Sequence, residues 1–165
     1  DPHYLALMAH VLLQLGDVRS ARKMCDLLRS AGASGGHGGG GEGGGNQHGA
    51  LLANLEGLLL FASDDFQEAI PKFEQAAALA PGMAAGHNNV AVGHMYAKNL
   101  HVSIKLLENK LAQNNTFVLQ RAMVLNLCSM YELASTRCNE SKQTLHSWIL
   151  KRASDDFDPS TTRLA

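Results

Sequence analysis

The chain has 165 residues and a formal net charge of −1; apolar residues make up 45% of it and aromatic residues only 5%. This length is enough for one domain with a core or for a short array of repeats. The balanced charge excludes a global field that would attract nucleic acid or anionic lipid. No apolar run approaches the roughly 20 residues that a bilayer-spanning helix needs.

The first predicted pair of helices lies within residues 1–30, where apolar residues recur at helical spacing in LALMAHVLLQLGDVRSARKMCDLL. Gly16 and Asp17 separate the two helices, because this pair is typical of a tight turn. The chain starts at Asp1 and Pro2 without an initiator Met. We therefore expect it to be a piece of a longer protein.

Residues 31–49 read AGASGGHGGGGEGGGNQHG and offer almost nothing to bury. Because glycine has a high ordering entropy, we expect a disordered insertion between the first and second helical pairs. A stack of helices tolerates such an insertion, since loop length costs little. No GxxxxGK[ST] motif occurs, so phosphate binding is not indicated.

Residues 50–83 carry the clearest pattern, ALLANLEGLLLFASDDFQEAIPKFEQAAALAPG. Small residues recur where two helices would approach each other, large residues recur where the gap between them would be filled, and a proline ends the second helix. The residues that we expect to pack in this repeat are Gly57, Ala69, Phe73, Ala76 and Pro81.

The pattern returns after 34 residues in 84–117, with Ala91 and Leu107 at the places of Gly57 and Phe73. Residues 118–153 form a divergent fourth repeat and cap, in which we expect Tyr131 to pack. Residues 154–165 are expected to be an acidic tail. A generic helical bundle with small residues placed by chance is the alternative, but two adjacent units in one register argue against it.

These positions of small and large residues resemble the tetratricopeptide repeat family. The resemblance implies an all-α solenoid of about four helical hairpins with a divergent C-terminal capping helix. In this family the first helix of each hairpin lines a groove that binds a partner. The residues at those positions are Leu51, Asn54, Leu58, Phe61, Ala85, Asn88, Val92 and Met95. Because they include no Lys or Arg, a clamp for a peptide carboxylate is not indicated.

Catalytic, metal and cofactor sites are not predicted. His87, His94 and His101 are seven residues apart, which places successive side chains roughly 10 Å apart along a helix, too far for one zinc ion. No catalytic triad, GxSxG or HExxH motif occurs. The three cysteines form no CxxC pair and are expected to be reduced thiols. We therefore predict that the chain is not an enzyme and takes no cofactor.

The C-terminal half has a narrower resemblance, carried by HNNVAV, MYAKNLHVSIKLLE, VLNLCSMYELASTR and FDPSTTRLA. It is similar to the C-terminal end of the subunit-twelve family of the trafficking protein particle (TRAPP) complex. That resemblance implies a non-enzymatic scaffold in a cytoplasmic vesicle-tethering complex, with other subunits of the complex as partners. It also implies action at endoplasmic reticulum–Golgi membranes, reached only through the complex, and in autophagy.

Two alternatives stay open at this point. The chain could be a free-standing peptide-binding repeat receptor of the co-chaperone or import type. It could instead be a subunit of another large cytosolic assembly built from the same repeats. The sequence does not name the direct partner, the bound segment or the oligomeric state.

Overall fold

A computed structural model describes residues 1–34, 42–113, 119–153, 157–162 and 164. Every regular element in these ranges is helical, so the expectation of an all-α fold built from helical hairpins is confirmed. The chain divides into two compact units, Asp1–Pro81 and Gly82–Ala165. Each unit contains two hairpins.

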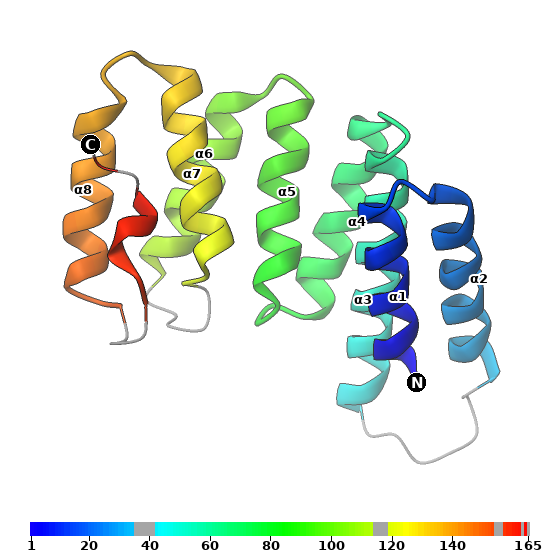
Figure 1. The fold of residues 1–165 in the computed structure, drawn as a ribbon. Helices are drawn as coiled ribbons and strands as arrows, with labels where there is room; N and C mark the ends of the chain where they lie inside the picture. Colours follow the sequence, from blue (N-terminus) through cyan, green and yellow to red (C-terminus); the bar gives the residue numbers. More distant parts are fainter. Residues whose placement is uncertain (35–41, 114–118, 154–156, 163, 165) are drawn as a thin grey trace. The chain divides into compact units, whose positions relative to one another are not determined.

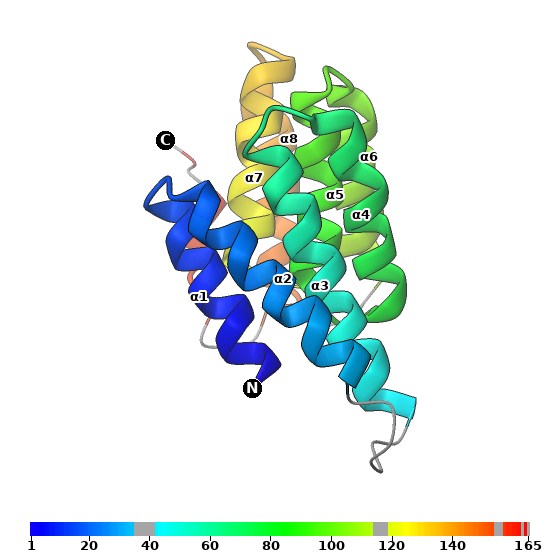
Figure 2. The same cartoon turned by 90° about the vertical axis from the view of Figure 1, so that its right-hand side faces the viewer.

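The first unit consists of α1 (Pro2–Gln14), α2 (Val18–Ser34), α3 (Glu42–Phe61) and α4 (Phe66–Leu79). Short turns join α1 to α2 and α3 to α4, so each pair is antiparallel (Figure 1). Helix α3 packs against both α1 and α2 (Figure 2). The apolar core of this unit is built mainly from alanine and leucine side chains, among them Ala9, Ala21, Leu28 and Leu55.

The second unit repeats this arrangement with α5 (Ala84–Tyr96), α6 (Leu100–Ala112), α7 (Arg121–Ala134) and α8 (Cys138–Leu150). Helix α7 contacts both helices of the preceding hairpin. A 3-10 turn, η2 (Pro159–Thr162), packs on α7 and α8. The core of this unit is centred on Leu107, Leu127, Met130 and Ile149, all of them fully buried.

Four of the five packing residues expected in the second repeat are buried, whereas the fifth, Pro81, is exposed. A Cβ atom added to Gly57 would lie 2.5 Å from Cε1 of Phe73, so only glycine lets α3 and α4 approach this closely. Ala69 and Ala76 are fully buried, and Pro81 lies just beyond the end of α4. In the second unit Ala91 and Leu107 are buried at the equivalent places, and Tyr131 is buried in α7.

Three of the four turns between paired helices share one backbone conformation. Gly16, Asp64 and Lys98 have φ angles of 79°, 64° and 67°, in the left-handed region. In each turn the next residue donates its backbone N–H to a carbonyl five residues earlier, as Asn99 does to His94. These bonds satisfy carbonyl groups at the end of the first helix. Only the first turn has glycine at the left-handed position, so the other two turns hold a residue with a side chain in a strained backbone conformation.

The expected disordered insertion at 31–49 differs from the structure at both of its ends. Helix α2 continues to Ser34 and α3 begins at Glu42, while residues 35–41 lie outside the described residues. The physical reason is tertiary packing: the ring of His48 lies so close to Gly32 that a Cβ atom there would be 2.5 Å from Nε2. Gly32 therefore allows α2 and α3 to stay in contact.

The expected acidic tail at 154–165 also differs where it is described. Thr161 and Thr162 of η2 are buried against the last hairpin. Their hydroxyl groups are hydrogen-bonded, and Thr162 Oγ1 lies 2.9 Å from Nδ1 of His146. Asp158 accepts bonds from the backbone N–H and the hydroxyl of Ser160. Because the polar groups of this short segment form hydrogen bonds within the fold, the segment can be buried against α7 and α8.

Candidate partner-binding surface

In the first unit the candidate surface lies on α3. Leu58 and Phe61 are half-buried and three residues apart, so they share one face of the helix. Phe61 also packs edge-on against Phe66, with ring centroids 4.9 Å apart and an interplanar angle of 66°. Leu51 is half-buried and packs against the core. Leu58 and Phe61 therefore form the part of this surface that best fits an apolar partner.

Asn54 does not belong to the open surface. Its exposed fraction is 4%, so the expectation that it lines the groove differs from the structure. A buried amide must be satisfied by groups inside the fold. Asn54 therefore contributes to packing within the unit, and a partner cannot reach it without a rearrangement.

In the second unit the candidate residues lie on α5. Asn88 is half-buried, and its Oδ1 accepts a hydrogen bond of 2.8 Å from Nδ2 of Asn126 in α7. This bond connects the first helices of two consecutive hairpins. Val92 and Met95 are half-buried and pack on the core of the unit, whereas Ala85 is exposed. The candidate surface on α5 is apolar except for the amide pair of Asn88 and Asn126.

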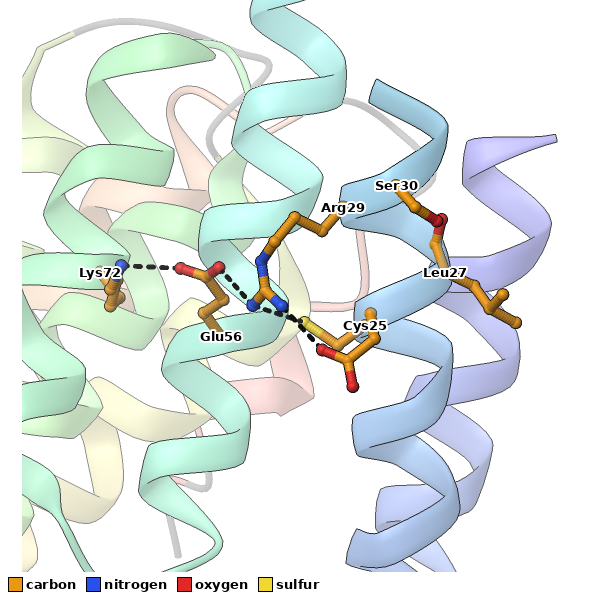
Figure 3. Close-up of polar contacts among 7 residues, drawn as sticks. Cys25, Leu27, Arg29, Ser30, Glu56 and Lys72 are labelled. Carbon is orange, nitrogen blue, oxygen red and sulfur yellow. Dashed lines mark hydrogen bonds and ion pairs between the residues drawn. The ribbon is translucent and has the colours of Figure 1, made fainter. Parts of the chain in front are cut away.

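Four charged side chains of the first unit form a network that joins three helices (Figure 3). Glu56 of α3 accepts from Arg29 of α2 at 2.9 Å and from Lys72 of α4 at 2.7 Å. Arg29 also pairs with Asp26 at 2.7 Å. Burial by itself raises the pKa of Glu56, but the hydrogen bonds from Lys72 and Arg29 outweigh it and lower that pKa. This network joins the first hairpin of the unit to the second.

A separate ion pair joins the two helices of the last hairpin. The ammonium group of Lys142 in α8 donates to a carboxylate oxygen of Glu132 in α7. The exposed fraction of Lys142 is 4%, an unusual environment for a lysine. The pair connects the end of α7 to the start of α8. Sequence reasoning missed both this pair and the network around Glu56, because neither follows the repeat pattern.

In the described part of the chain, no group of three or more His, Cys, Asp or Glu side chains is arranged to hold a metal ion. Within the same ranges no helix is both long enough and apolar enough to span a membrane. Cys25 and Cys128 are buried and Cys138 is half-buried, all three as free thiols.

Comparison with known proteins gives two related matches. Over its whole length the chain is 28% identical to trafficking protein particle complex subunit 12 of Mus musculus, of which it covers 20%. It is 27% identical to the protein of the same name in Homo sapiens, of which it covers 21%. The chain therefore spans about a fifth of the length of the curated relatives it matches.

No family model matches the chain. No solved structure matches it. The resemblance to subunit 12 is nevertheless confirmed, because the alignment covers the whole chain. The tetratricopeptide nature of the repeats stays a prediction from the spacing of small and large residues.

Proposed function

We propose that this chain is a non-enzymatic protein–protein interaction module in a subunit of a vesicle-tethering complex. The observation that carries the proposal is the alignment of all its residues with subunit 12 of the trafficking protein particle complex in two mammals. The fold supports it, because arrays of helical hairpins present extended surfaces to other proteins.

The partners in this proposal are other protein subunits of the complex. They bind the surface formed by Leu51, Leu58 and Phe61 in the first unit, or the surface formed by Ala85, Asn88, Val92 and Met95 in the second. Apolar side chains at half-exposed positions favour an apolar segment or an amphipathic helix of the partner. The surface residues include no lysine or arginine, which disfavours a ligand held by its terminal carboxylate.

The cellular role in this proposal is transport between the endoplasmic reticulum and the Golgi, with a further role in autophagy. The protein would be cytoplasmic and would meet membranes only through the complex. These assignments follow from the resemblance to subunit 12.

The experiment is affinity purification of the full-length protein from its own cells, followed by identification of the proteins recovered in stoichiometric amounts. We expect subunits of a tethering complex. Recovery of chaperones or import factors in their place would favour the peptide-receptor alternative. Recovery of a different large assembly would also overturn the proposal.

A further inference from the structure

A pocket in the second unit lies away from the surface discussed above. It is lined by residues of α6, α7 and α8, is open to solvent and has a volume of about 290 Å³. Its walls are mostly apolar and include Leu111, Leu127, Leu145 and Trp148. Sites for small organic ligands usually have volumes of about 300–1,000 Å³, so this pocket is better suited to one or two side chains of another protein.

One formally charged residue lines the pocket, and it is Glu108 of α6. The hydroxyl group of Tyr131 donates to Oε1 of Glu108 at 2.7 Å, which orients the carboxylate toward α7. Burial, and then the hydrogen bond to Glu108, raises the pKa of Tyr131, so the phenol stays a donor at neutral pH. The pocket therefore combines apolar walls, two aromatic rings and one fixed negative charge.

This combination selects among possible occupants. A purely apolar side chain would fill the walls but would make no use of the carboxylate of Glu108, which is exposed to solvent. An arginine or lysine side chain has an apolar stem for the walls and a cationic head for the carboxylate. The rings of Tyr131 and Trp148 would add attraction for the cation.

A second hollow continues from the pocket along α8. Thr144 and Trp148 line both hollows, and the second one ends at Lys151 and Arg152. The guanidinium carbon of Arg152 lies 5.1 Å from the centroid of the Trp148 ring. Glu140 lies at the opposite end, one helical turn before Thr144. The groove is therefore acidic at the start of α8 and basic at its end.

Thr144 marks the position of the pocket and Lys151 marks the basic end of the second hollow, so their separation sets the spacing of a ligand. Thr144 and Lys151 are seven residues apart on one helix, which corresponds to roughly 10 Å along its axis. An extended segment rises about 3.3 Å per residue, so it would cross this distance in about three residues.

We propose that this groove binds an extended segment of a partner protein that carries an arginine or lysine and, about three residues away, an aspartate or glutamate. The basic side chain enters the pocket and pairs with Glu108, and the acidic side chain pairs with Lys151 or Arg152. Binding at this groove does not depend on which complex the protein joins.

The direct test uses the fluorescence of Trp148, which is the single tryptophan of the chain. The probe is an acetylated and amidated peptide in which two alanines separate an arginine from a glutamate. We expect a saturable change in fluorescence that weakens with added salt. A matched peptide with citrulline in place of arginine keeps the shape without the charge, and it should bind about tenfold more weakly.

Two variants test whether the peptide binds at the groove. Glu108→Gln keeps an acceptor for Tyr131 but removes the charge, and it should weaken binding of the arginine peptide about tenfold. Lys151→Gln tests the other end of the groove and should also weaken binding. Glu74→Gln on α4 in the first unit is the matched control and should bind as the unaltered protein does. Circular dichroism melts establish that each variant is folded.

Three results would overturn the proposal. One is the absence of saturable binding up to millimolar peptide. Another is equal binding of the arginine and citrulline peptides. The third is binding that Glu108→Gln leaves unaltered in a folded protein. None of these results bears on the proteins that co-purify with the full-length chain, so the two proposals fail separately.

Discussion

Gly57 on α3 lies directly against the ring of Phe73 on α4, and a Cβ atom at residue 57 would be 2.5 Å from Cε1 and 2.6 Å from Cδ1. Phe73 is almost completely buried, so its ring has little room to move. This contact fixes how closely the second hairpin closes. It also explains why a glycine occurs in the middle of a helix, where it is otherwise unfavourable.

The first prediction follows from this contact. Gly57→Ala should lower the free energy of unfolding by about 1–3 kcal/mol, because the added methyl group overpacks the α3–α4 contact. Urea unfolding followed by circular dichroism measures the change. Gly82→Ala is the matched control, since no atom lies within 4 Å of a Cβ there. Equal effects of the two substitutions would argue against the packing described for this hairpin.

The second prediction concerns the turn between α5 and α6. Lys98 has a positive φ angle, so Lys98→Gly should stabilise the protein by about 0.5–1 kcal/mol by relieving backbone strain. Lys105→Gly in the middle of α6 should destabilise it by about 1 kcal/mol. Thermal melts of both variants show whether each substitution raises or lowers the stability of the protein. A loss of stability in Lys98→Gly would contradict the turn geometry.

The third prediction is a dependence on pH. The folded-state pKa of Glu56 lies below its value in the unfolded chain, which is about 4.3. Its contribution to stability is therefore complete above that unfolded value and is lost as the pH falls through the folded-state pKa. Unfolding curves between about pH 6 and pH 3 should show a smaller acid loss in Glu56→Gln than in the unaltered protein. Parallel curves for the two proteins would exclude this role of Glu56.

The fourth prediction concerns the last hairpin. Glu132→Gln should destabilise the protein by about 1–3 kcal/mol, because Lys142 then keeps a buried charge without its carboxylate partner. Lys142→Met should recover part of that loss when it is combined with Glu132→Gln. A double-mutant cycle measures the coupling. Additive effects would show that the two groups do not interact in solution.

The repeated spacing of small and large residues predicted much of the fold. Gly57, Ala69 and Ala76 are the clearest cases, because a small residue opposite a large one has few other uses in a helix. The extra turns of α2 and α3 could not be predicted in this way. Their glycine-rich composition argues for disorder, and only the contact between Gly32 and His48 reveals the packing.

The candidate surface was only partly predictable. A register gives the side of a helix on which a residue lies, but burial depends on the neighbouring helix. Asn54 is buried for that reason, and Asn88 is held by Asn126 from the next hairpin. The buried Lys142 and the covered Thr161 and Thr162 are polar residues that sequence alone places in solvent.

The measurement that tests the central claim most directly is the amount of tethering-complex subunits recovered with a full-length Leu58→Glu variant relative to the unaltered protein. The variant places a charge on the half-exposed apolar face of α3, so recovery should fall about tenfold or more while the thermal melt is retained. Leu133→Glu, at an exposed leucine of α7, is the matched control and should leave recovery unaltered. Full recovery of the subunits with a folded Leu58→Glu protein would contradict the claim that this face binds the complex.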